Sequence, residues 1–497
     1  MMRSFSQVAL GVILLLATGV LSAGQTIPRH PSNLTYELLD FTPPTASDHR
    51  HELSNGVVVF VVEENELPLV SVSVTVRTGG YLDPPTKLGL ASLTGGQMRA
   101  GGTTTIGAAD FDERAAFLAA QIGSNIGATS GGASMNCLTK DIDVCLDLFF
   151  DMLRSPGFNP DRLALAKSQV IQEMERRNDS TGSIERREWR RLMRGDDHFS
   201  TLPRTRATIE AITRTDLVAF HSEYFHPGNF IFAVSGDVQT DGIRRELEER
   251  LSDWAVEGQT VGPVPAPQDT PQPGLYLVDK SDVNQGRVAI GHLGTMRDNP
   301  DRYKLLVMND ILGGGGFSAR LLTRIRSDEG LAYSASSNFG VGVYYPGVFQ
   351  VGFQSRSETV ARATAIVLEE IDRIRSEPVE DQELANSIAY FVETFSRNFS
   401  SAASTAGLFA NDEYTGRDPA YLATYRENIA AVTADDVLEV AQHYLDPAGL
   451  AILVVGNLDA ILAGDPERPE FALEVMSPGD VVRIPLPDPV TMEYPER

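Results

Sequence analysis

The sequence is short of cysteine, of lysine and of basic residues in general. Its 497 residues include two cysteines and five lysines, and 42 Lys and Arg stand against 67 Asp and Glu, a formal charge of −25. Nucleic acids and anionic membrane surfaces are bound through basic side chains, so this balance argues against both as partners. Two cysteines are too few for a disulfide framework or a cysteine-based zinc site. Cys137 lies in a strand-like segment and Cys145 in a helix-like one, which favours buried thiols over a disulfide.

Long apolar runs are absent beyond the N-terminus. Residues 8–21 form an apolar run of fourteen, with Arg3 before it and small residues at 22–24. The run is short for a membrane span and therefore predicts a signal peptide over residues 1–24, with an uncleaved anchor as the alternative. We expect an exported, periplasmic protein with no membrane association after cleavage.

The two halves of the chain repeat each other. Residues 209–236 and 429–456 share eight identities at a constant offset of 220. Each copy has a Thr at a helix N-cap position with Asp three residues later, then a helical stretch ending at Tyr, a Pro and an apolar strand. A period of this length predicts a duplicated domain. Five prolines between Pro263 and Pro273 predict a stiff linker between the copies.

The remaining pattern predicts an α+β fold. Strand-like segments at 57–62 and 70–77 and helix-like segments at 108–121, 141–154 and 160–177 do not alternate strictly. This favours a mostly antiparallel sheet covered by helices in each of two homologous domains. The expected organisation is a signal peptide (1–24), a lead-in (25–47), an N-terminal domain (48–255), a proline-rich linker (256–274), a C-terminal domain (275–465) and a tail (466–497).

Several motifs resemble those of the pitrilysin/insulinase family of zinc metallopeptidases. They are G-L-A at 89–91 with G-G-T at 101–103, P-x-F at 156–158, and the Y-x-x-P…G segment of each repeat. The resemblance extends over residues 48–465 and points to the mitochondrial-processing-peptidase-like branch, which occurs as paired subunits. It implies two homologous domains that form a clam-like half-chamber.

The zinc motif of that family is degenerate in this chain. Active members carry H-x-x-E-H directly after G-L-A, in which two His bind zinc and the Glu is the general base. Here those positions are Ser92, Gly95 and Gly96, and only Glu173 stands where the family has its third ligand. A solvated Glu on an amphipathic helix explains Glu173 better than a metal-binding role does. The eight histidines, among them His221 and His226 five residues apart, show no spacing that would rebuild a zinc site.

A second motif is intact. Gly313, Gly314, Gly315 and Gly316 precede a helix expected from about Ser318, and R-x-x-x-G-L-A-Y follows at 326–333. In silent subunits of the family, an Arg and a Tyr from this motif reach the zinc subunit. The resemblance therefore assigns Arg326 and Tyr333 to hydrogen-bonding the substrate carbonyl and the oxyanion, and the four glycines to substrate contact.

Each of these assignments has a structural alternative. An ion pair with Asp328 or Glu329 would explain Arg326, a half-buried strand aromatic would explain Tyr333, and a tight turn that brings a helix close to a sheet would explain the glycines. Arg320 and Arg324 are expected to be solvated or to face a partner.

Three functions fit the sequence. The first is a non-catalytic subunit of a heterodimeric exported peptidase, whose homologous H-x-x-E-H partner supplies zinc while this chain helps to bind peptide in extended form, for example by adding it to a sheet edge. The second is a non-enzymatic scaffold or peptide-binding protein on the same fold. The third is a self-sufficient peptidase with an unfamiliar metal site. The acidic balance further suggests that basic peptides are preferred.

Overall fold

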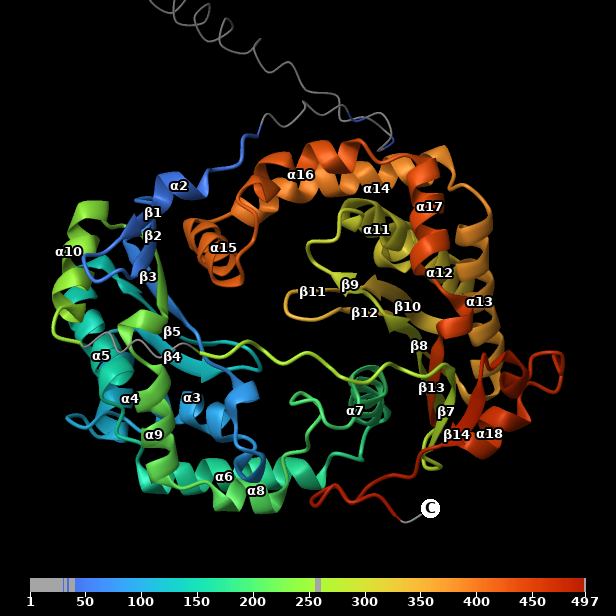
Figure 1. The fold of residues 1–497 in the computed structure, drawn as a ribbon, viewed down its shortest axis with the longest axis horizontal. Coiled ribbons are helices and arrows are strands. Elements are labelled where there is room, and N and C mark those ends of the chain that lie inside the picture. Colours follow the sequence, from blue (N-terminus) through green and yellow to red (C-terminus); the bar gives the residue numbers. More distant parts are fainter. Residues whose placement is uncertain (1–29, 31–33, 35–40, 255–260, 496–497) are drawn as a thin grey trace, which may run out of the picture. The chain divides into compact units, whose positions relative to one another are not determined.

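The computed structural model describes residues 30, 34, 41–254 and 261–495, and the described residues from 43 onward form one compact unit (Figure 1). The predicted signal peptide lies outside the described residues. Within the described ranges, no helix combines the length and apolar character needed to cross a membrane. Both cysteines are free and buried, and burial raises the pKa of each thiol, as expected for inert core residues.

The N-terminal half builds a six-stranded sheet in the order β1-β2-β6-β3-β5-β4. Its longest strands alternate between a buried and a half-buried side, because successive side chains point to opposite faces of a sheet. β2 and β6 are parallel, and the other neighbours are antiparallel. The strands are β1 (Arg50–Glu52), β2 (Val58–Glu63), β3 (Leu69–Val76), β4 (Gln121–Ile126), β5 (Gly131–Leu138) and β6 (Phe230–Gly236).

The C-terminal half repeats this topology. Its sheet has the order β10-β12-β8-β13-β7-β14, so that β7, β13, β8, β12 and β10 follow one another as β2, β6, β3, β5 and β4 do, again with the first pair parallel. The duplication predicted from one segment thus extends to five of the six strands of each sheet, whereas β1 is antiparallel and β14 parallel to its neighbour. The strands are β7 (Gly274–Asp279), β8 (Gln285–Leu293), β10 (Ala332–Phe339), β12 (Val348–Arg356), β13 (Ala451–Gly456) and β14 (Asp480–Arg483), with β9 (Thr295–Met296) and β11 (Val341–Gly342) as a separate parallel pair.

The repeated helices begin as the sequence predicts. Thr213 and Thr433 each form a capping box with the Asp three residues later, at the starts of α9 (Arg214–Tyr224) and α17 (Ala434–Tyr444). The other helices are α2 (Ala46–His49), α3 (Leu90–Ala100), α4 (Ala108–Phe117), α5 (Ile142–Arg154), α6 (Pro160–Glu175), α7 (Thr181–Arg194), α8 (Arg206–Ala211), α10 (Thr240–Leu251), α11 (Arg302–Asn309), α12 (Arg320–Leu322), α13 (Val360–Ser376), α14 (Asp381–Thr394), α15 (Ala402–Thr415), α16 (Ala420–Ala430) and α18 (Leu458–Ala463).

Each sheet is covered on one face by a helix from the other half of the chain. The buried side chains of α15 pack against Phe60, Ile231 and Ala233 of the N-terminal sheet. Ile184, Trp189 and Met193 of α7 pack in the same way against β7, β8 and β13. The opposite face of each sheet is covered by helices of its own half, α5, α9 and α10 in the first and α13 and α17 in the second. This exchange ties the two halves through apolar contact.

Three expectations need adjustment. The helix expected over 108–121 ends at Phe117, because Gln121 already begins β4. The sheets are mostly antiparallel, as expected, but each contains parallel neighbours: β2 with β6 in the first, and β7 with β13 and with β14 from the tail in the second. The tail also continues past the second sheet: Arg177 and Asn178 donate hydrogen bonds to the carbonyl oxygens of Pro489 and Pro487. The described part of the linker, 261–273, contains no helix or strand.

Candidate functional site

Helix α3 carries the degenerate zinc motif. Ser92 and Gly96, one turn apart, lie on its exposed face, whereas Gly95 is buried. A Cβ atom at Gly95 would lie 2.3 Å from the backbone nitrogen of Ile126 on β4, and the carbonyl oxygen of Gly95 accepts a hydrogen bond from Ser124 at 2.7 Å. The helix therefore sits too close to β4 to admit any side chain where active relatives have their general base.

The donor set of this region does not fit zinc. A catalytic zinc is held by three protein ligands, and glycine offers no side-chain donor. Glu173 on α6 is exposed and lies among arginines. Across the described residues no three His, Cys, Asp or Glu side chains gather in a way that could hold a metal ion. We derive no catalytic step through a metal in this chain.

The buried histidines have structural partners instead. His221, at 7% exposure, shares a hydrogen bond with the carbonyl oxygen of Leu153 at 2.9 Å and stacks on Phe225. Burial lowers the pKa of His221 from its ordinary 6.5 to about 4. His221 therefore joins α9 to the end of α5 as a neutral ring.

This lowered pKa predicts acid sensitivity. Because the unfolded chain takes up the proton below pH 6.5 and the folded chain only near pH 4, the contribution of His221 to stability is complete above pH 6.5 and falls by about 1.4 kcal/mol per pH unit down to pH 4. His221→Gln should flatten urea-unfolding stability over this interval relative to wild type. His443→Gln, at an exposed helix position, is the control and should leave the slope unchanged. Equal slopes for wild type and His221→Gln would refute the assignment.

The glycine run forms a tight connection next to β10. Residues 310–314 make one π-helical turn, and a Cβ atom at Gly313 would lie 2.6 Å from the backbone nitrogen of Ser337. Gly314 and Gly315 are similarly close to Asn309 and Asp310, while Gly316 has φ +65° and open space around it. Close packing thus accounts for three of the glycines without a peptide, as the alternative reading proposed, and leaves Gly316 exposed beside the site. The expected helix from Ser318 begins at Arg320 and passes into a second π-helical segment, Thr323–Asp328.

Arg326 and Tyr333 lie together at the end of this segment. The guanidinium of Arg326 stands 4.7 Å from the ring centre of Tyr333 and 4.9 Å from that of Phe317. Tyr333 is 82% exposed and Phe317 77% exposed, so the half-buried alternative for Tyr333 is wrong. Tyr333 lies on the edge strand β10, where the register with β12 shifts. π-Helical turns and strand bulges recur at functional sites.

The neighbouring arginines differ from Arg326 in being paired. Glu329 pairs with Arg362, and among the described residues no carboxylate forms an ion pair with Arg326. The expectation that Arg320 and Arg324 are solvated or partner-facing is wrong. Arg320 is 7% exposed and forms a forked pair with Glu383, and Arg324 pairs with Glu370 at 2.7 Å. Arg326, Tyr333 and Phe317 thus form a cation–aromatic cluster whose two rings are exposed, and the neighbouring Arg320 and Arg324 are held in ion pairs.

Phe317 was not among the residues chosen from the sequence. The available signal was a phenylalanine directly after a glycine run, a place where an apolar side chain is easily left in solvent.

Comparisons with known proteins point to a peptidase family that includes inactive members. Residues 211–390 match the family described as "Peptidase M16 inactive domain". The "Non-peptidase homolog YmxG" of Helicobacter pylori is 23% identical over 424 residues, covering 82% of this chain and 93% of its own. The crystal structure of a peptidase M16 inactive domain from Pseudomonas fluorescens superposes with a TM-score of 0.73 at 22% identity, covering 82% and 97%. The periplasmic protease PqqL from Escherichia coli gives a TM-score of 0.70 at 16% identity, covering 90% of this chain and 50% of its own.

The fold, two mixed six-stranded sheets covered by helices, matches that of solved M16 structures. The chain is thus similar in sequence and fold to proteins of the M16 (pitrilysin/insulinase) family, and residues 211–390 match its inactive-domain type.

Proposed function

We propose that this chain is the non-catalytic subunit of an exported heterodimeric zinc metallopeptidase. A homologous H-x-x-E-H subunit supplies zinc and the general base, and Arg326 and Tyr333 of this chain reach its active site. The two chains together enclose a chamber that takes peptide. The exposed cluster of Arg326 and Tyr333 carries the proposal, because strong donors that have no carboxylate partner in the described chain are available to a substrate.

The chemistry follows from these donors. Zinc in the partner activates water and polarises the scissile carbonyl when bound. The Arg326 guanidinium and the Tyr333 hydroxyl donate hydrogen bonds to the carbonyl oxygen and to the charge that develops on it. The ring contacts hold the guanidinium in place before substrate arrives, which lowers the reorganisation needed in the reaction. Gly316 offers open backbone beside the cluster for contact with the peptide.

The proposal also includes export of the protein to the periplasm. The N-terminal sequence has the features of a signal peptide, and a structural neighbour is titled a periplasmic protease. Fractionation of cells carrying the tagged full-length chain tests this point. A cytoplasmic, unprocessed product would contradict it.

Co-purification tests the partnership. The tagged chain should bring down an H-x-x-E-H homologue, and the pair should cleave peptides that neither chain cleaves alone. The second candidate, a scaffold without enzymatic role, draws on the name of the Helicobacter relative, a non-peptidase homolog. It is favoured if the recovered partner lacks H-x-x-E-H or if peptidase activity is independent of this chain.

A further inference from the structure

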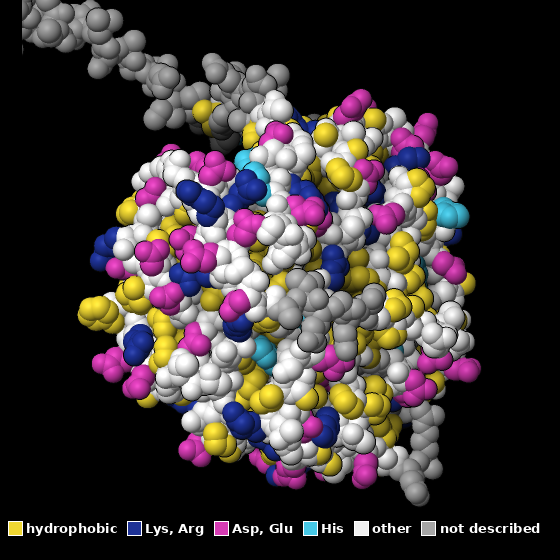
Figure 2. All heavy atoms as spheres, turned by 60° about the vertical axis from the view of Figure 1, so that its left-hand side comes forward, with side chains coloured by type: hydrophobic (Ala, Val, Ile, Leu, Met, Phe, Trp, Pro, Cys, Tyr) yellow, Lys and Arg dark blue, Asp and Glu magenta, His cyan; other side chains and the backbone are white. Residues whose placement is uncertain are grey.

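An arginine-lined cavity stands apart from the cluster of Arg326 and Tyr333. It has a volume of about 670 Å³, within the usual range for binding pockets, and is walled by the end of α6, by α7, by the loop at 196–204 and by the C-terminal segment. Two carboxylates line it, Glu173 and Asp196. Seven arginines line it: Arg176, Arg177, Arg186, Arg187, Arg190, Arg191 and Arg204. This excess is the reverse of the chain's overall charge of −25. Figure 2 shows acidic and basic side chains interspersed over one face of the molecule, without a comparable block of one sign.

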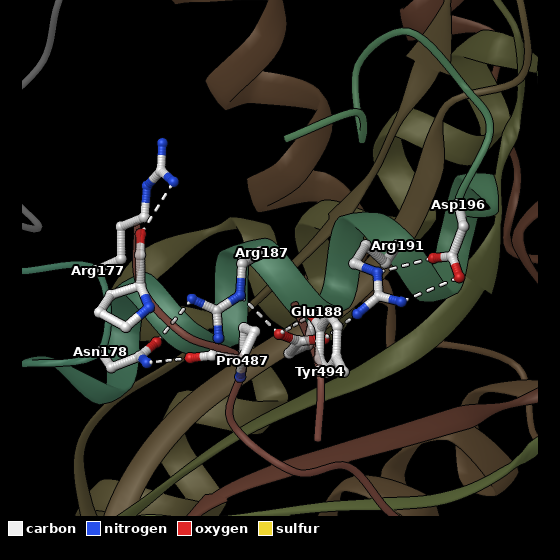
Figure 3. Close-up of polar contacts among 9 residues, drawn as sticks. Arg177, Asn178, Arg187, Glu188, Arg191, Asp196, Pro487 and Tyr494 are labelled. Atoms are coloured by element: carbon white, nitrogen blue, oxygen red, sulfur yellow. Dashed lines mark hydrogen bonds and ion pairs between the residues drawn. The ribbon is translucent and has the colours of Figure 1, made fainter. Parts of the chain in front are cut away.

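Two of these arginines are neutralised within the protein. Arg187 and Arg191 flank the buried Glu188, and Arg191 forms a second, forked pair with Asp196 at 2.7 and 3.0 Å (Figure 3). The hydroxyl of Tyr494 also donates to Glu188. The wall therefore already uses arginine forks to hold carboxylates.

The other five have no ion-pair partner among the described residues; they are Arg176, Arg177, Arg186, Arg190 and Arg204. Arg177 directs its guanidinium at the carbonyl oxygens of Pro489 and Arg204. Burial, together with the positive charges of Arg204 and Arg187, lowers the pKa of Arg177 to about 10. Burial and the neighbours Arg194 and Arg186 lower the pKa of Arg190 as well. Asp83 interacts electrostatically with Arg204, but no carboxylate among the described residues forms an ion pair with any of the five, and such concentrated positive charge is relieved by an anion.

The surroundings of the arginines indicate which anion fits. Leu202, Pro203, Met492 and Tyr494 place apolar surface between the charges. The same region already binds a stretch of polypeptide, because Asn178 and Arg177 hold main-chain carbonyl oxygens of the C-terminal segment (Figure 3). A chain with spaced carboxylates and apolar side chains matches this wall better than a compact polyphosphate, which has no apolar groups to place against Leu202, Pro203 and Met492.

We propose that this cavity binds a peptide segment rich in Asp and Glu, whose carboxylates pair with Arg186, Arg190 and Arg204. The preference is opposite to the basic-peptide preference that overall charge suggests. The site is independent of Arg326, Tyr333 and any zinc-bearing partner, so it can be tested on the isolated chain.

Fluorescence anisotropy of the purified chain tests the proposal with a short fluorescein-labelled Glu/Leu peptide. This peptide should bind, its Lys/Leu counterpart should not, and salt should weaken binding because the charges are partly exposed. Arg186→Ala/Arg190→Ala and, separately, Arg204→Ala should each weaken binding about tenfold or more, as expected for loss of charge-assisted hydrogen bonds. Arg114→Ala, at an exposed position of α4, is the matched control and should bind as wild type does. Thermal unfolding of each variant verifies its fold.

Equal binding of the acidic and basic peptides, or wild-type binding by the folded cavity variants, would overturn the site. Tripolyphosphate is the competing probe. If it binds in an Arg186- and Arg190-dependent way while the acidic peptide does not, the peptide assignment is wrong.

Discussion

Replacing Arg326 by Ala and Tyr333 by Phe should each lower the peptidase activity of the reconstituted heterodimer by about 10²–10³-fold, the usual effect of losing one oxyanion donor. The loss should lie mainly in kcat, because the donors act most strongly on charge that develops in the transition state. Tyr333 is exposed and Arg326 is half-buried, and neither holds a buried partner, so the fold should tolerate their removal. Steady-state kinetics on a fluorogenic peptide measures the effect.

Matched controls separate this role from general surface effects. Arg356→Ala removes an exposed arginine at the end of β12, and Tyr390→Phe removes the hydroxyl of another exposed tyrosine, on α14. Both should keep full activity and normal association with the partner. Full activity of Arg326→Ala/Tyr333→Phe in an intact complex would remove the proposed catalytic role.

The second large effect is expected at Gly95, a position where the Glu of active family members cannot be reintroduced without disturbing the fold. Gly95→Ala should destabilise the protein by about 3 kcal/mol, the upper end for an overpacked interior, because its Cβ meets the backbone of β4 and not a flexible side chain. Gly95→Glu should be worse, since it also buries a carboxylate. The combined Ser92→His/Gly95→Glu/Gly96→His variant should therefore fold poorly and fail to bind zinc stably. Urea unfolding and metal content measure these outcomes.

Gly96 provides the control one residue away. Nothing lies within 4 Å of a Cβ atom at this position, so Gly96→Ala should stabilise α3 by about 0.5–1 kcal/mol through helix propensity. If Gly95→Ala were as stable as Gly96→Ala, the close approach of α3 to β4 would be wrong. A well-folded, zinc-binding triple variant would likewise contradict it.

Local sequence signals predicted local structure well. The Thr–Asp capping boxes at 213 and 433, the strand-like segment at 70–77 and the helix-like segment at 160–177 each depend on neighbouring residues, and the structure has them at the starts of α9 and α17, as β3 and as α6. The repeat extended further than its eight identities, because a duplicated fold keeps its strand order after most identities are lost. The end of the helix over 108–117 was overestimated because Leu118, Ala119 and Ala120 have ordinary helical composition. Ala119 instead takes φ +49° before β4.

The long-range features of the fold could not be predicted from the sequence. That α7 and α15 each cover the sheet of the other half depends on the path of the whole chain. Arg320 pairs with Glu383, 63 residues away, whereas Arg326 has no ion-pair partner among the described residues, and no local pattern distinguishes the two arginines. Most of the arginines between 176 and 204 stand in adjacent pairs in the sequence. That they line one cavity, however, depends on the fold.

The most direct test of the central claim is zinc content and peptidase activity, measured side by side on this chain, on its H-x-x-E-H partner and on the purified complex. The account predicts that zinc resides in the partner, that this chain alone is inactive, and that the complex cleaves peptide far faster than either chain. Zinc-dependent cleavage by this chain alone, or a complex no more active than the partner by itself, would contradict it.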